Sequence, residues 1–250
     1  MKIRQNDIGH SFSTSKKRFL HKSTIHNMFT TELEYPYWQR TVSLLAQRYG
    51  LDTKETFEEA AFAQKGINTD FFIELLHLFN TESELPIEQF KTFPIPIILD
   101  YLQKTHHYYL NKKLLEIEQS ISNLRNQLPE NHLLPFLENF FVWIKENLTF
   151  HIRMEEEQLF PHILALYLKV KDKKGFSIQQ FIENHADTVE LQLSEVKKHI
   201  VRAQSSVSEI FPFRVLLKQL DEFEKDLRIH AKIEDEVLIP ISLELELTNK

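Results

Sequence analysis

The chain has 250 residues, of which 42% are hydrophobic, so it is long enough to bury a substantial core. Its 30 basic and 36 acidic residues give a formal net charge of −6 at pH 7, which argues against a surface built to bind nucleic acid or an anionic membrane. Cysteine is absent, which excludes disulfides, thiolate metal sites and thiol nucleophiles, so any metal must be held by His, Asp and Glu.

Helices are the structure that this composition favours. The chain has only four glycines, too few for the glycine-rich loops of nucleotide-binding proteins or the frequent tight turns of an all-β protein. The N-terminal stretch lacks the apolar core of a signal peptide, and no later stretch reaches the length of a membrane span. We therefore expect an all-α protein of the cytoplasm.

Two regions precede the main part of the chain. Residues 1–34 are polar without a clear period and predict a mobile arm. Residues 35–90 predict a small helical domain with short helices in "WQRTVSLLAQRYG", "KETFEEAAFAQKG" and "NTDFFIELLHLFN", the first two ending at Gly50 and Gly66, which are placed like helix C-caps. The segment "LPIEQFKTFPIPI" predicts a linker, because each proline biases its predecessor away from helix. A domain boundary near residue 90 follows, and the part beyond it is expected to fold alone.

Residues 91–250 predict a four-helix bundle. Apolar residues recur there at three-and-four spacing in four stretches, separated by polar breaks at "LPENH", "KDKKGFS" and "QSSVSE". The four stripes are Leu102, Leu110, Leu114, Ile117 and Ile121; Leu137, Phe141, Ile144, Leu148 and Ile152; Phe181, Val189, Leu193, Val196 and Ile200; and Leu216, Leu220, Phe223 and Leu227.

The bundle sequence contains an internal repeat. "HIRMEEEQLFP" at residues 151–161 is matched by "HAKIEDEVLIP" at residues 230–240, an offset of 79 (230 minus 151). The same offset carries His106 to His185, so each half has one histidine on its first helix and His-x3-Glu on its second. A helix pair duplicated about a pseudo-twofold axis brings equivalent side chains together in the bundle interior.

The repeated residues predict a metal site. Residues four apart share a helix face, so each His-x3-Glu pair can converge on one point. Two buried carboxylates among four imidazoles are costly unless cations neutralise them, and two metal ions about 3.5–4 Å apart would do so. Each ion would take two histidines, both glutamates would bridge, and iron is favoured for such a donor set. The predicted ligands are His106, His151, Glu155, His185, His230 and Glu234.

Other interpretations apply to single residues. One His-x3-Glu pair alone is common on helix surfaces, and a duplication can preserve such residues for packing alone. His107 points about 100° away from His106 around the helix axis, so at most one of the two faces the interior. The repeat favours His106. The neighbouring acids Glu156, Glu157, Asp235 and Glu236 are interpreted as solvated or supporting residues. Pro161 and Pro240 are predicted to end or kink their helices.

The motifs carry a resemblance to a known family. "YLQKTHH", "HIRMEEEQLFP", "ENHADT" and "HAKIEDEVLIP" resemble the hemerythrin-like di-iron proteins of the repair-of-iron-centres family, the YtfE/ScdA type. The resemblance covers residues 95–245 and implies a hemerythrin-like four-helix bundle with an oxo- and carboxylate-bridged centre of two iron ions. Residues 44–68 resemble, more faintly, the family's small N-terminal domain, but its cysteine pair is missing here.

The resemblance implies a role in repairing iron–sulfur clusters damaged by oxidative or nitrosative stress, with damaged iron–sulfur proteins as clients. An alternative is a hemerythrin-like protein that carries or senses oxygen or nitric oxide. Hemerythrins proper use a fifth histidine and an aspartate in place of the second His-x3-Glu, and the symmetry here favours the repair type. An oxidase or nitric oxide reductase on the same centre stays open, since open coordination positions serve binding and turnover alike.

Overall fold

The structure, a computed structural model, describes residues 36–51, 59–81, 84–170, 176–184, 189–202 and 211–248. Every regular element in these ranges is a helix, which confirms the predicted all-α class. The elements are α2 (Pro36–Arg48), α3 (Glu59–Gln64), α4 (Thr69–Thr81), α5 (Ile87–Phe90), α6 (Ile95–Tyr108), η1 (Tyr109–Lys113), α7 (Leu114–Gln127), α8 (Leu134–Met154), η2 (Glu155–Leu159), α9 (Phe160–Tyr167), α10 (Ile178–Asn184), α11 (Val189–Arg202), α12 (Phe211–Ile233), η3 (Glu234–Leu238) and α13 (Ile239–Thr248).

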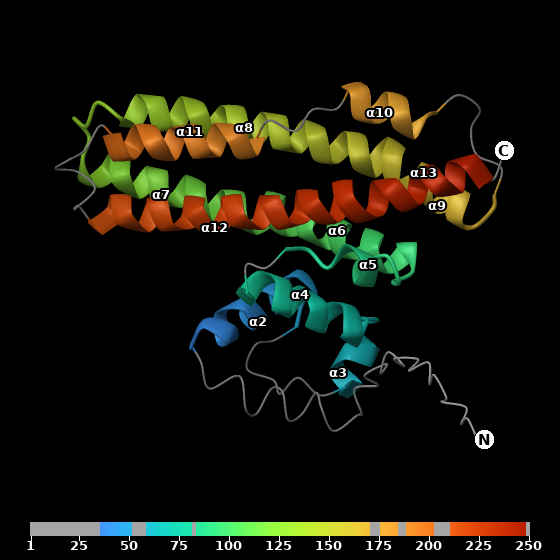
Figure 1. Ribbon diagram of the computed structural model, residues 1–250. Coiled ribbons are helices and arrows are strands. Elements are labelled where there is room, and N and C mark those ends of the chain that lie inside the picture. The colour runs from blue at the N-terminus through green and yellow to red at the C-terminus, as the bar shows by residue number, and fades with distance from the viewer. Residues whose placement is uncertain are drawn as a thin grey trace, which may run out of the picture.

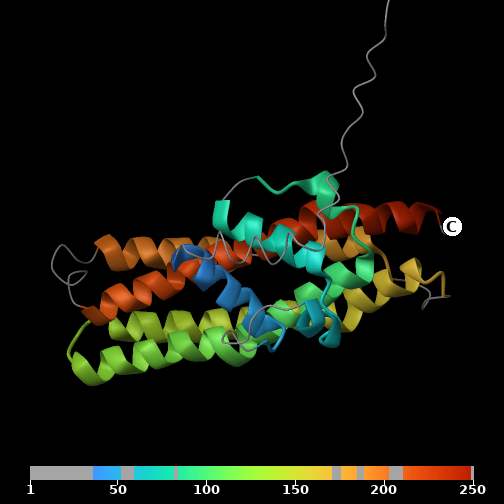
Figure 2. The same cartoon turned by 90° about the horizontal axis from the view of Figure 1, so that it is seen from below.

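The long helices form the predicted bundle. In Figures 1 and 2, α7, α8, α11 and α12 lie side by side, and α7 packs on α8 and α12 while α11 packs on the same two helices. The predicted apolar stripes supply the core between them, with Leu114, Leu137, Val196 and Phe223 among its buried members. The break predicted at 128–132 is the loop between α7 and α8, whereas most of the other two breaks lies outside the described residues.

In the described part of the chain, three single π-helical turns interrupt the helices. Two of them, η2 and η3, begin at Glu155 and Glu234 and are therefore related by the offset of the repeat. In each, the carbonyl of the glutamate accepts a hydrogen bond from the N–H five residues on, at Phe160 or Ile239. Such turns are frequent at functional sites.

Of the two outcomes predicted for the prolines, a helix end is wrong, because the helices continue past both of them. Pro161 and Pro240 each follow a π turn and lie in the first turn of the next α-helical segment, α9 or α13. A proline has no N–H to donate, but that position of a new helical segment does not need one. The helical path therefore continues beyond both metal-site motifs.

The N-terminal helices end as predicted. Gly50 and Gly66 have φ of +63° and +67°, the left-handed conformation in which a side chain is strained. The N–H of Leu51 bonds the carbonyl of Ala46, and that of Ile67 bonds the carbonyl of Phe62, so both helices close with a glycine C-cap.

The N-terminal helices share a hydrophobic core with the bundle. Leu45 of α2 and Phe72 of α4 belong to the same buried cluster as Leu102, Phe160 and Ile233. The proline-rich segment is itself packed, because it contains α5, which ends at the fully buried Phe90. The domain boundary near residue 90 stays a prediction, and this shared core argues against independent folding of the part beyond it.

No helix in the described part of the chain is long and apolar enough to cross a membrane.

Candidate metal centre

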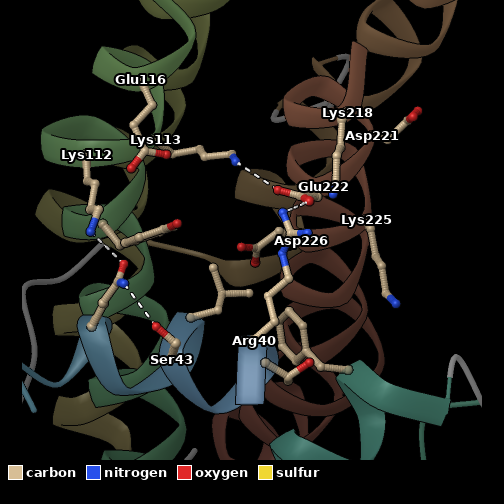
Figure 3. Close-up of a pocket in the computed structure, with 15 residues that line it drawn as sticks. Arg40, Ser43, Lys112, Lys113, Glu116, Lys218, Asp221, Glu222, Lys225 and Asp226 are labelled. Atoms are coloured by element: carbon tan, nitrogen blue, oxygen red, sulfur yellow. Dashed lines mark hydrogen bonds and ion pairs between the residues drawn. The ribbon is translucent and has the colours of Figure 1, made fainter. Parts of the chain in front are cut away.

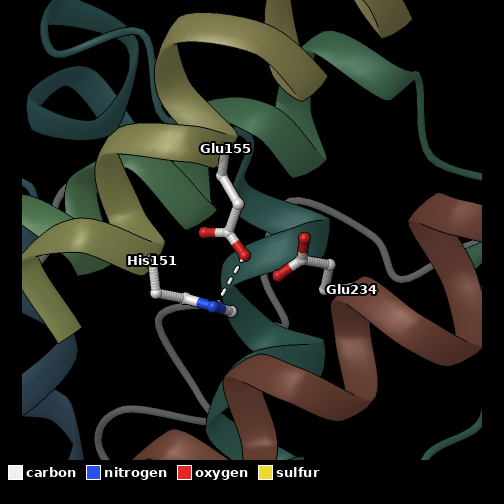
Figure 4. Close-up of side chains that lie close together, drawn as sticks. All are labelled: His151, Glu155 and Glu234. Carbon is white, nitrogen blue, oxygen red and sulfur yellow. Dashed lines mark ion pairs between the residues drawn. The ribbon is translucent and has the colours of Figure 1, made fainter. Parts of the chain in front are cut away.

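The two His-x3-Glu motifs converge inside the bundle. His151 and Glu155 come from the end of α8 and the start of η2, and Glu234 comes from the start of η3 on the opposite helix. Figure 4 shows the three side chains pointing toward one another, and one ligand atom from each lies within 4.8 Å of the other two. His151 Nε2 lies 2.7 Å from Glu155 Oε1.

His106 reaches the same place from α6. Its side chain is 1% exposed and stacks on the ring of Phe160 with centroids 5.6 Å apart. The Nε2 atom lies 3.2 Å from Glu155 Oε2, while Nδ1 lies 3.0 Å from Glu156 Oε1. One imidazole nitrogen therefore faces the centre, and the other is oriented by a half-exposed carboxylate, the arrangement that outer-shell residues give to metal-binding histidines.

His230 lies next to His106. Their ring centroids are 4.8 Å apart, and His230 Nδ1 lies 3.9 Å from Glu234 Oε2. The Nε2 atom of His230 is buried and has no hydrogen-bond partner in the described part of the chain. Because a buried polar atom without a partner is costly, a ligand that accepts its lone pair, such as a metal ion, fits this position.

The surroundings shift the pKa values of His106 and His230 in opposite directions. Burial favours the neutral form of His106, but the hydrogen bonds that its ring donates to Glu155 and Glu156 outweigh this and raise its pKa above the usual value. Burial lowers the pKa of His230 well below the usual value, and the neighbouring His106 lowers it further. His230 is thus a neutral imidazole with an available lone pair, the form that binds a metal ion.

The structure brings together five of the six predicted ligands. His106, His151, Glu155, His230 and Glu234 all belong to this cluster, whereas His185 lies outside the described residues. His107 is exposed and contacts Asn111 along the same helical stretch. This agrees with the prediction that His106, and not His107, faces the bundle interior. The donor set is imidazole and carboxylate without sulfur, which fits a transition-metal cation.

A buried polar network flanks the cluster and was not predicted from the sequence. Arg48 of α2 forms a fully buried ion pair with Asp226 of α12, one helical turn before His230. Tyr109, the first residue of η1, donates a hydrogen bond of 2.8 Å to Asp226 Oδ1, and its ring centroid lies 5.9 Å from that of His230. Burial raises the pKa of Tyr109 well above the usual value, so the hydroxyl keeps its proton. The network connects the N-terminal helices to a predicted ligand.

The sequence of the bundle matches a known protein family. The sequence profile of the family described as "Hemerythrin HHE cation binding domain" matches residues 99–242, which run from α6 to α13 and include all six predicted ligand positions. No curated protein matches the chain.

Proposed function

Because the chain belongs to the hemerythrin HHE cation-binding family, whose profile matches more than half of it, we propose that it holds two iron ions and donates iron to damaged iron–sulfur proteins. The observation that carries this proposal is the convergence of both His-x3-Glu motifs on one buried point. Each half of the repeat supplies one carboxylate and two histidines to the proposed site, and this symmetry suits two ions better than one. Iron bound there would supply redox chemistry and open coordination positions.

The ligand set favours an iron cargo that is released on reduction. Glu155 and Glu234 are the two anionic groups among the proposed ligands, and the others are neutral imidazoles in the metal-bound state. Ferric ions are attracted strongly to carboxylates, and reduction removes one positive charge from each ion. No thiolate is present to hold the softer ferrous ion, so its affinity for the site is expected to fall.

Iron release is the test of this function. We expect the anaerobically reduced protein to transfer iron to a ferrous chelator or to an apo iron–sulfur protein much faster than the oxidised protein does. Chelator absorbance measures the transfer, with the oxidised protein as the control. Retention of both ions after reduction, with a reversible oxygen or nitric oxide adduct, would instead favour the carrier or sensor. Catalytic consumption of oxygen or nitric oxide without iron loss would favour an oxidase or reductase.

The doublet at 106 and 107 tests the ligand assignment. We expect His106→Ala to lower the iron content and the visible absorption of the purified protein, because its buried Nε2 faces Glu155 at 3.2 Å. His107→Ala is the matched control, since this exposed ring points away from the centre and should change neither quantity. Elemental analysis and an absorption spectrum suffice, and the reverse pattern would mean that the helix register is wrong.

A further inference from the structure

A cavity separate from the metal centre lies between the N-terminal helices and the bundle. It has a volume of about 580 Å³, within the range of small-molecule sites. Figure 3 shows α2 along one side, the helix of Lys112 and Lys113 on another, and α12 opposite. None of the six proposed metal ligands lines it, so its occupant would be distinct from the iron cargo.

One lysine points into this cavity and forms no hydrogen bond with the part of the chain that the structure describes. Lys113, the last residue of η1, is only 5% exposed, and its ammonium extends toward Glu222 (Figure 3). The ammonium forms a long ion pair with Glu222, whose Oε2 atom lies 3.8 Å away, beyond hydrogen-bond distance. Glu222 is already paired with Arg40. An ammonium with three donors and no hydrogen-bond acceptor among the described residues favours an anion beside it.

The charges around the cavity favour the same occupant. Its basic residues are Arg40, Lys112, Lys113, Lys218 and Lys225. Its acidic residues are Glu116, Asp221, Glu222 and Asp226. Asp226 pairs with Arg48, and Asp221 pairs with Lys197, which also pairs with Glu224. Neither Arg48 nor Lys197 lines the cavity. The lining therefore holds more basic residues than acidic ones, in a protein whose net charge is −6.

Apolar side chains complete the lining. Leu44 and Phe79 come from the N-terminal helices and Tyr108 comes from the end of α6, so the cavity offers apolar side chains beside its cations. We propose that this cavity binds a small organic anion, whose aromatic body packs against Leu44, Phe79 and Tyr108 and whose acidic group pairs with Lys113. Such a ligand would bridge the N-terminal helices and the bundle.

Calorimetric titration tests the site with 8-anilinonaphthalene-1-sulfonate, an aromatic anion, added to the full-length protein as purified. We expect saturable binding of one probe per chain, with a dissociation constant on the order of tens of micromolar for a ligand of this size. Two control ligands should each bind at least about tenfold more weakly. The uncharged analogue N-phenyl-1-naphthylamine lacks the acidic group, and sulfate ion lacks the aromatic body.

Two variants locate the binding. Lys113→Met keeps the length of the side chain but removes the charge, and should weaken probe binding about tenfold or more. Leu44→Trp should also weaken binding, because a larger side chain fills the cavity. Lys145→Met is the control, since Lys145 is an exposed lysine of α8 that pairs with Glu118 and does not line this cavity. Thermal unfolding checks that each variant is folded. Absence of one-to-one binding to the native protein, or equal binding by Lys113→Met, would overturn the proposal. Iron release does not enter this measurement, so its result is independent of the proposed function.

Discussion

Replacing Glu155 by alanine is expected to abolish binding of the two proposed metal ions. Its carboxylate lies between two proposed ligands, with Oε1 2.7 Å from His151 and Oε2 3.2 Å from His106, and it is 1% exposed. The substitution takes away one of the two proposed anionic ligands and leaves Glu234 alone with the imidazoles to hold two cations. Since loss of an outer-shell partner alone lowers metal affinity roughly 10- to 100-fold, loss of this ligand should exceed that.

Glu157→Ala provides the matched control for this experiment. Glu157 belongs to the same π turn, but its side chain is exposed and its ion pair with Arg153 is loose, at 3.9 Å. Metal content by elemental analysis should fall to near zero in Glu155→Ala and stay at the native level in Glu157→Ala. Full metal content in Glu155→Ala would show that the ions are held elsewhere, and equal loss in both variants would point to a general effect of acidic charge.

Much of the fold could be predicted because it depends on local periodicity. The stripe of Leu137, Phe141 and Ile144 needs only a helix with one apolar face, and all three side chains are buried in the bundle. Gly50 could be assigned as a cap because few other residues adopt its positive φ. The candidate ligands could be found for a different reason, since the repeat marks the same positions twice.

The π turns were harder to predict. A proline after a buried glutamate indicates a break in the helix, but it does not distinguish a helix end from a wider turn that continues the helix. The sequence left a helix end and a kink open for Pro161 and Pro240, and in the structure both prolines follow a π turn in a helix that continues. Both prolines lie at the same position of the repeat, just after the candidate ligands. This shared position could have indicated that the local helix geometry serves the site.

The pairing of Arg48 with Asp226 could not be predicted. Asp226 interrupts an apolar stripe one turn before His230, so its inward position could be read from the helix period. Nothing in the sequence near Arg48, however, identifies a partner 178 residues away. Such a contact is set by how the N-terminal helices dock on the bundle, which depends on long-range packing.

Replacing Arg48 by methionine should destabilise the protein more than other single changes on its N-terminal helices. The guanidinium is buried, donates hydrogen bonds to Tyr101 (3.1 Å) and Thr105 (3.0 Å), and pairs with Asp226. Burial alone would lower the pKa of Arg48, but Asp226 raises it above the usual value, so the pair is ionised. Removing one partner of a buried ion pair leaves the other charge uncompensated, which costs about 3–5 kcal/mol.

Denaturant unfolding of four variants separates this charge effect from a general loss of packing. Arg40→Met is the matched control, because Arg40 lies on the same helix and pairs with Glu222 of α12 at an exposed position, where such a pair is worth about 0–1 kcal/mol. Asp226→Asn removes the opposite charge but keeps an acceptor for the Tyr109 hydroxyl. The double variant Arg48→Met/Asp226→Asn should therefore be more stable than the sum of the two single losses predicts, by about 1–3 kcal/mol. Strict additivity, or an Arg48→Met loss no larger than that of Arg40→Met, would mean that the buried pair does not hold the N-terminal helices on the bundle. With the coupling present, the docking of these helices and the position of His230, whose ring lies beside Tyr109, depend on the same carboxylate.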